Sequence, residues 1–119
     1  MLSLETSKKL KDAGLKWKPK YLDQWTYQNG QAGKPLTGDY EDRMVIEYTN
    51  HFIWLPRLDQ ILAEIEARGY QWRLDHLDGR YCMQISNINI KGTNVRAFYD
   101  ISPKESAAAA LLWILEQEQ

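Results

Sequence analysis

Residues 70–85 read YQWRLDHLDGRYCMQI and predict a β-hairpin whose register can be counted. On both sides of Asp78-Gly79, apolar and aromatic residues alternate with polar ones, as expected for strands with one buried face. The dipeptide itself is typical of a two-residue type I′ turn. Because the turn and the alternation agree, they specify one register. The cross-strand pairs on the apolar face are then His76 with Tyr81, Leu74 with Met83, and Trp72 with Ile85.

Helices are predicted before and after this hairpin. Between Pro56 and Gly69, apolar residues recur at i, i+3, i+4 and i+7 and predict a helix over residues 56–68. The segment Ser102-Pro103-Lys104-Glu105 forms a capping box with proline at the first helical position. It predicts a last helix over residues 103–115. Alternation over residues 95–101 predicts a third strand between the hairpin and this helix.

The N-terminal half is expected to contain a shorter helix and two strands. Ser3 as N-cap and Gly14 after the last turn predict a helix over residues 4–13. Residues 24–28 and 44–48 have strand character. The resulting order, α-β-β-α-β-β-β-α, predicts an α+β fold with a mainly antiparallel sheet and helices packed on one face. The length of 119 residues predicts a single domain over residues 1–119.

Composition excludes several classes of protein. The net charge of −1 argues against a surface that is basic throughout. The single cysteine, Cys82, can form neither an intramolecular disulfide nor a thiolate metal site. The N-terminal residues lack the apolar core of a signal peptide, and the longest apolar run, residues 107–115, is far shorter than the ~20 residues of a membrane span. We therefore expect a cytoplasmic protein with no membrane segment.

Motifs for catalysis and for cofactors are missing from the sequence. Its glycines match neither a phosphate loop nor a dinucleotide fingerprint, and no nucleophile elbow occurs. His76 and Asp75 would face opposite sides of a strand, with no third metal ligand near them. The acidic residues Asp39, Glu41 and Asp42 lack the spacing of a calcium loop. We expect no enzymatic activity, no cofactor and no metal, and an enzyme with a site near His76 is a remote alternative.

Positive charge is concentrated near the N-terminus, next to a segment with several aromatic residues. Six lysines and two carboxylates give residues 1–20 a net charge of +4, so the remainder carries −5. Within residues 16–27 lysines interleave with aromatic rings, a combination that can grip single-stranded nucleic acid through its phosphates and stacked bases. The alternative is that the rings pack inward while the lysines face solvent. The candidate binding surface comprises Lys16, Trp17, Lys18, Lys20, Tyr21, Trp25 and Tyr27.

The last helix is apolar on every side over residues 107–115, so more than one of its faces must be covered. Either neighbouring helices cover it, or a second subunit does, which would make a homodimer. The aromatic residues of the second half are assigned to buried faces of its strands and of this helix. They are Tyr70, Trp72, Tyr81, Tyr99 and Trp113.

From residue 56 onward the order α-β-β-β-α is similar to the topology of the double-stranded-RNA-binding domain. A member of that family would place several lysines at the start of its last helix, facing phosphates. Only Lys104 stands there in this chain, beside Glu105. The resemblance covers topology only, and we expect no RNA binding through this half.

Three stretches carry a second resemblance. They read LETSKKLKDAGL (residues 4–15), LPRLDQILAEIEARGY (residues 55–70) and SPKESAAAALLWIL (residues 102–115). In these stretches the chain resembles small uncharacterised proteins of phages and prophages in low-GC Gram-positive bacteria. The resemblance implies a phage-related setting and a small soluble protein, and it implies no activity, catalytic residue or cofactor.

The leading interpretation is a small non-enzymatic accessory protein that acts through protein–protein contacts. It rests on the missing catalytic motifs, on the apolar last helix, and on the tryptophan and tyrosine content, because these rings are enriched at interfaces. The alternative is a nucleic-acid-binding module that uses residues 16–27.

Overall fold

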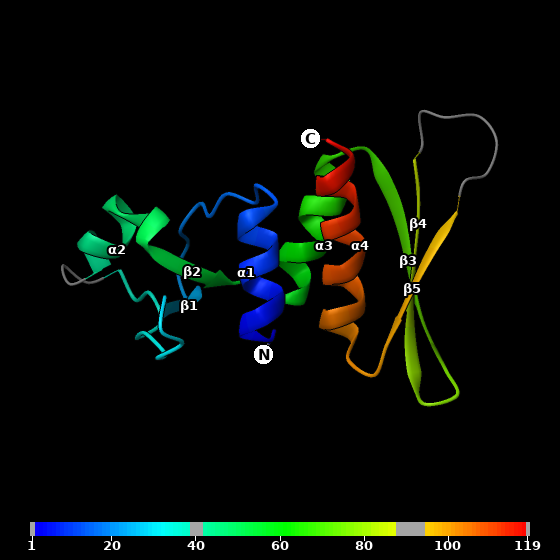
Figure 1. Cartoon of the computed structure of the whole chain (residues 1–119), viewed down its shortest axis with the longest axis horizontal. Helices are drawn as coiled ribbons and strands as arrows, with labels where there is room; N and C mark the ends of the chain where they lie inside the picture. Colours follow the sequence, from blue (N-terminus) through cyan, green and yellow to red (C-terminus); the bar gives the residue numbers. More distant parts are fainter. Residues whose placement is uncertain (1, 39–41, 88–94, 119) are drawn as a thin grey trace. The chain divides into compact units, whose positions relative to one another are not determined.

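The computed structural model describes residues 2–38, 42–87 and 95–118. It divides the chain into two compact units, Met1–Pro56 and Arg57–Gln119, and each is described by itself. Helices and antiparallel sheets in both units confirm the α+β class (Figure 1). The prediction of a single domain over residues 1–119 is not tested by this division and stays a prediction.

The second unit is a three-stranded antiparallel sheet with two helices on one face (Figure 1). The sheet order is β3-β4-β5, which makes β3 and β5 the edge strands. Helix α4 contacts α3, β4 and β5, and helix α3 contacts β3. In chain order the elements are α3 (Leu58–Ala67), β3 (Tyr70–Leu77), β4 (Arg80–Asn87), β5 (Arg96–Asp100) and α4 (Pro103–Gln117).

The hairpin register predicted from the sequence is confirmed. Leu74 pairs with Met83 and Trp72 with Ile85 across β3 and β4. Asp78 and Gly79 both have positive φ, 53° and 75°, as a type I′ turn requires. Met83 and Ile85 are buried on the face that the helices cover, which is the face that the alternation assigned to the core.

The third strand carries its side chains in the opposite phase to the one expected. Phe98 pairs with Met83 and therefore shares the helix-covered face, whereas Tyr99 pairs with Cys82 and points to the other side of the sheet. The assignment of Tyr99 to a buried face is wrong, since it is exposed. Trp72 is also partly exposed, because β3 is an edge strand, and its indole N–H donates to Glu66 Oε1.

Helix α4 begins as predicted, with Ser102 as N-cap and Pro103 in the first turn. Most of its apolar residues are buried, and the helix contacts α3, β4 and β5, while Ala109 is exposed and Trp113 is half-buried. The prediction of a homodimer through the last helix stays a prediction. The buried positions are Ala107, Ala108, Ala110, Leu111, Ile114 and Leu115.

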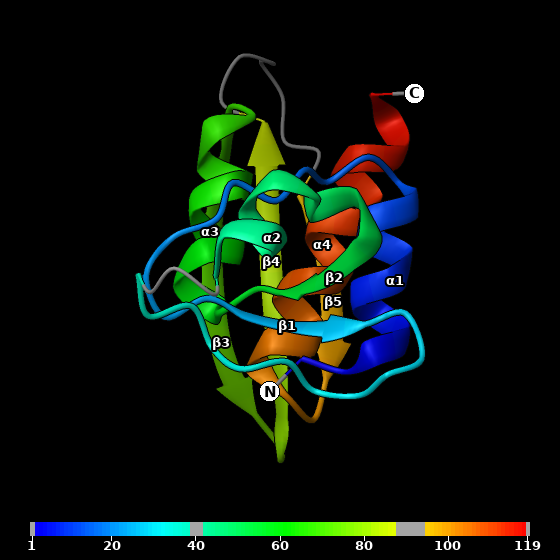
Figure 2. The ribbon, with the colours of Figure 1, turned by 90° about the vertical axis from the view of Figure 1, so that its left-hand side faces the viewer.

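The first unit combines a helix with a two-stranded antiparallel sheet. Figure 2 shows β1 and β2 as neighbouring strands, with α1 beside β2. Helix α1 has the predicted N-cap, in which Ser3 Oγ accepts from the Thr6 backbone N–H. The elements are α1 (Leu4–Asp12), β1 (Gln24–Tyr27), α2 (Arg43–Glu47), the 3-10 turn η2 (Thr49–His51) and β2 (Phe52–Leu55).

The predicted strand over residues 44–48 is wrong. Helix α2 occupies this segment, and the partner of β1 is instead β2, whose four residues are all apolar. Only Val45 of α2 is buried, while Met44 and Ile46 are exposed, so their apolar character does not mark a buried strand face. Asp42 precedes α2, and its Oδ2 accepts from the backbone N–H groups of Thr37 and Gly38. The rest of the acidic segment, residues 39–41, lies outside the described residues.

Candidate functional site

The ribbon of β1 and β2 presents one aromatic face. Trp25 pairs with Trp54 and Tyr27 with Phe52, and directly opposed residues of antiparallel strands point to the same side. The rings of Trp25 and Phe52 meet edge to face with centroids 4.8 Å apart, and those of Trp25 and Tyr27 are 5.0 Å apart. We call these four residues, Trp25, Tyr27, Phe52 and Trp54, the aromatic face.

Trp25 belongs to the core of the first unit, and its place on the candidate binding surface is corrected. Only 5% of it is exposed, in a cluster with Leu36, Val45 and Phe52. Its indole N–H donates to the Lys34 backbone oxygen at 2.8 Å. Both faces of this ring are therefore unavailable for stacking on a base. For Trp25, the alternative given in the sequence analysis is correct: its ring packs into the core.

Trp17 is held at the edge of the same cluster by a buried carboxylate. It is half-buried and packs against the cluster that contains Trp25. Its indole N–H donates to Asp23 Oδ2 at 2.9 Å, and the Lys20 backbone N–H donates to the same oxygen at 2.9 Å. Asp23 is fully buried. The carboxylate thus folds the segment between Trp17 and Asp23 into a fixed loop and sets the orientation of the indole ring.

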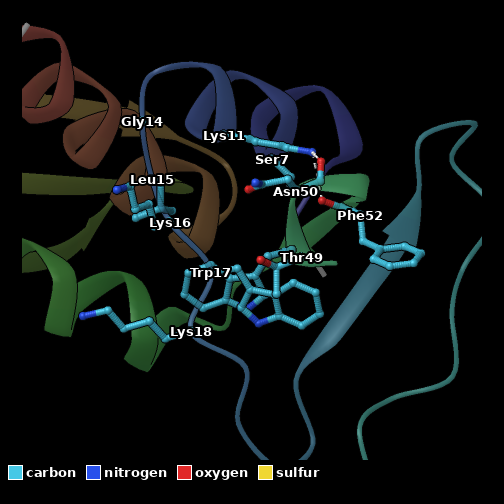
Figure 3. A pocket seen from close by; sticks show the side chains of 11 residues that line it. Ser7, Lys11, Gly14, Leu15, Lys16, Trp17, Lys18, Thr49, Asn50 and Phe52 are labelled. Carbon is cyan, nitrogen blue, oxygen red and sulfur yellow. Dashed lines mark hydrogen bonds between the residues drawn. The ribbon is translucent and has the colours of Figure 1, made fainter. Parts of the chain in front are cut away.

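A pocket of about 520 Å³ opens beside Trp17. Its walls come from α1, from the segment that follows α1, from η2 and from β2, all within the first unit (Figure 3). Two members of the aromatic face, Phe52 and Trp54, line it together with Trp17. The described residues that line it are Ser7, Lys11, Gly14, Leu15, Lys16, Trp17, Lys18, Thr49, Asn50, Phe52 and Trp54.

The pocket is electropositive. Lys11, Lys16 and Lys18 line it, and none of the described residues that line it is acidic. Lys11 Nζ donates to the backbone oxygens of Asn50, at 2.6 Å, and of Phe52, at 3.0 Å, which fixes this ammonium group between α1 and β2 (Figure 3). Lys16 and Lys18 are exposed and extend from the segment on either side of Trp17.

Two lining residues carry buried polar atoms that lack a hydrogen-bond partner. Among the described residues that line the pocket, these atoms are Ser7 Oγ and Trp54 Nε1. Ser7 is 98% buried, since its exposed fraction is 2%. Buried polar groups are almost always paired in folded proteins, with protein or with water. The pocket wall therefore has one hydroxyl and one indole N–H with unused hydrogen-bonding capacity.

The structure brings together only part of the predicted surface. Lys16, Trp17 and Lys18 line the pocket, whereas Lys20 and Tyr21 do not. Tyr21 is 67% exposed, and Tyr27 is partly exposed at the rim of the aromatic face. The sequence reasoning missed Ser7, Lys11, Thr49, Asn50, Phe52 and Trp54. The apolar run over residues 52–55 was the available signal for β2, and with it for Phe52 and Trp54.

Titratable clusters elsewhere give no competing site. No group of three or more His, Cys, Asp and Glu side chains is placed to hold a metal ion in the described part of the chain. Cys82 is buried opposite Asp75 and Tyr99. A side-chain hydrogen bond with Cys82 raises the pKa of the exposed Tyr99 hydroxyl above its ordinary value, and the nearby Arg80 opposes this shift.

Within the described residues, the helices are too short or too polar to cross a bilayer. Comparisons with protein-family models, with curated proteins and with solved structures found no match.

Proposed function

We propose that the protein is a non-enzymatic binding protein whose first unit takes single-stranded nucleic acid at the pocket beside Trp17. The observation that carries the proposal is the convergence of three lysines and two tryptophans on one pocket, where no acidic residue of the described chain is part of the lining. We place this function ahead of contact with other proteins, because most apolar residues of the last helix are buried within the chain.

The lining chemistry matches a nucleotide of a single strand. Lysine side chains neutralise phosphates, and the faces of indole rings stack on bases without regard to their identity. A volume of about 520 Å³ lies within the 300–1,000 Å³ range of small-molecule pockets and can admit a nucleotide.

A single strand is favoured over a duplex because bases reach a pocket only when they are unstacked and unpaired. Lys20 and Tyr21, which lie outside the pocket and are exposed, can extend the contact to the neighbouring nucleotide. The proposed setting remains phage-related and cytoplasmic, and the proposed role remains binding without catalysis. Contact with a protein partner through the last helix stays a prediction.

The test is fluorescence anisotropy with a labelled oligothymidylate, titrated at several salt concentrations. We expect binding to the single strand and much weaker binding to a duplex of the same length. Binding weakens as salt rises, so the slope of log affinity against log salt is negative. In Lys16→Ala/Lys18→Ala the magnitude of this slope should decrease by about 1.4, because each lysine–phosphate contact on a single strand contributes about 0.7. Lys8→Ala, an exposed lysine of α1 that does not line the pocket, is the matched control and should leave the slope unchanged.

The stacking component is tested separately. Trp17→Leu should weaken binding by about thirtyfold, which corresponds to ~2 kcal/mol, the middle of the ~1–3 kcal/mol range of a base–aromatic stack. Competition with a free mononucleotide distinguishes a strand from a small metabolite. The proposal would be contradicted if the mononucleotide competed as well as the unlabelled oligothymidylate. It would also be contradicted if Lys16→Ala/Lys18→Ala bound with wild-type affinity.

A further inference from the structure

Within the described part of the chain, strand β5 has one open edge. The sheet order is β3-β4-β5, so among the described strands β5 is paired only with β4. An exposed strand edge carries unpaired backbone N–H and C=O groups and is a template for another strand. Along this strand and beyond both of its ends, apolar residues alternate with Arg96, Phe98 and Asp100, so the edge carries one charge of each sign and no net charge.

From this edge we infer that β5 pairs antiparallel with β5 of a second copy of the chain, around a two-fold axis at Phe98. The segment Val95-Arg96-Ala97-Phe98-Tyr99-Asp100-Ile101 is complementary to its own reverse. Pairing about Phe98 sets each residue opposite a residue of matching chemistry in the second copy. The pairs are Val95 with Ile101, Arg96 with Asp100, Ala97 with Tyr99, and Phe98 with Phe98.

The outer face of the paired strands would bury side chains that one chain leaves in solvent. Tyr99 is 58% exposed, Ile101 is 81% exposed, and Val95 is also exposed. In the dimer Ile101 meets Val95 of the second copy, and the large Tyr99 lies beside the small Ala97. Cross-strand side-chain pairs of this kind stabilise a sheet in addition to the backbone hydrogen bonds.

The helix-covered face supplies charge complementarity. Arg96 and Asp100 lie on this face, because they pair directly with Ile85 and Tyr81 of β4. Across the two-fold axis, Arg96 of each copy stands opposite Asp100 of the other, so two opposite-charge pairs form. Within one chain Arg96 lies over the Trp113 ring, 4.5 Å from its centroid, and Asp100 Oδ1 accepts from the Ser102 backbone N–H. These contacts hold both side chains in place along the edge.

A second copy is a better occupant than an unrelated peptide. Any extended peptide could satisfy the backbone groups of an edge. Only a strand with an acidic residue opposite Arg96 and a basic residue opposite Asp100, flanked by apolar ends, also satisfies the side chains. The reversed β5 segment has these residues at these positions. The contact is isologous, so it closes as a dimer and does not grow into a filament.

The test is light scattering of the full chain after size exclusion, over a series of concentrations. We expect the mass to rise with concentration from 14.0 kDa towards twice that value. Arg96→Asp and Asp100→Arg each place like charges opposite one another in a self-pair, so each variant alone should stay monomeric. An equimolar mixture of the two variants restores both opposite-charge pairs and should form a heterodimer.

The mixture also separates loss of pairing from loss of folding. Circular dichroism of each variant checks that it is folded, and a misfolded variant could not recover its dimer on mixing. Leu77→Ala, an exposed apolar residue of β3 away from this edge, is the control and should dimerise like the wild type. A wild-type chain that is monomeric at every concentration, or variants that dimerise alone as well as mixed, would overturn the inference.

Discussion

The two units of the chain are stabilised in different ways. In Arg57–Gln119 the core is made of apolar side chains that recur at helix and strand periods, such as Ile65, Met83 and Leu111. In Met1–Pro56 a smaller apolar cluster around Trp25 is supplemented by polar side chains that bind backbone or indole groups. Asp23, Asp42 and Lys11 each contact two backbone or indole groups in this way.

This difference explains where a ligand pocket can form. A core filled by periodic apolar side chains leaves little open volume, because interiors are close-packed. Loops that are tied by single polar residues can instead surround a hollow, and the pocket beside Trp17 lies among such segments. In the first unit apolar residues recur less regularly along the sequence, and this unit contains the pocket.

Leu111→Ala should have the largest effect on stability. Leu111 is fully buried in α4, so the truncation loses apolar burial and leaves a cavity. We expect the free energy of unfolding, measured by urea titration, to fall by about 2–5 kcal/mol. Leu77→Ala removes the same side chain from an exposed position and should change it by less than about 0.5 kcal/mol. Equal losses in the two variants would refute a core built on buried periodic residues.

Asp23→Ala should show that the first unit depends on a polar anchor. The substitution leaves the Trp17 indole N–H and the Lys20 backbone N–H without their acceptor. We expect a loss of about 2 kcal/mol, within the range for buried hydrogen bonds to a charged group. Hydrogen exchange followed by mass spectrometry should place the loss of protection in the first unit. The control is Asp12→Ala, an exposed carboxylate of α1, and an equal loss there would contradict the account.

Gly33→Ala should have a smaller effect, through the packing of Trp25. A Cβ atom at Gly33 would lie 2.3 Å from Trp25 Cζ2, so the buried ring has to move. We expect a loss of about 1–2 kcal/mol, as for other cases of overpacking. In a Trp25→Leu background the same substitution should cost much less, because the clash is gone. A loss that is unchanged in that background would show that the ring is not the obstacle.

The sequence predicted most of the second unit because its signals are local. The Asp78-Gly79 turn, the strand alternation and the Ser102 capping box each determine nearby backbone geometry. The phase of β5 could not be read in the same way. Its two faces are both partly apolar, and pairing with β4 places Phe98, not Tyr99, under the helices.

The first unit was harder to predict because distant polar contacts define it. A buried Asp23 bound to Trp17 has no periodic signature, and the four-residue apolar β2 is too short to separate from a helix segment. Lys16, Trp17 and Lys18 could be predicted as ligand contacts because lysines interleave with aromatic rings in this part of the sequence. Their partners across the pocket come from α1, η2 and β2, and only the folded structure brings these together.

The most direct test of the central proposal compares the indole N–H signals of the two units by NMR. The five tryptophans give separate probes, with Trp17, Trp25 and Trp54 in the first unit and Trp72 and Trp113 in the second. On addition of a short oligothymidylate, we predict that the Trp17 and Trp54 signals shift while those of Trp72 and Trp113 stay in place. No shift at saturating oligonucleotide, or shifts confined to Trp72 and Trp113, would contradict a nucleic-acid site at this pocket.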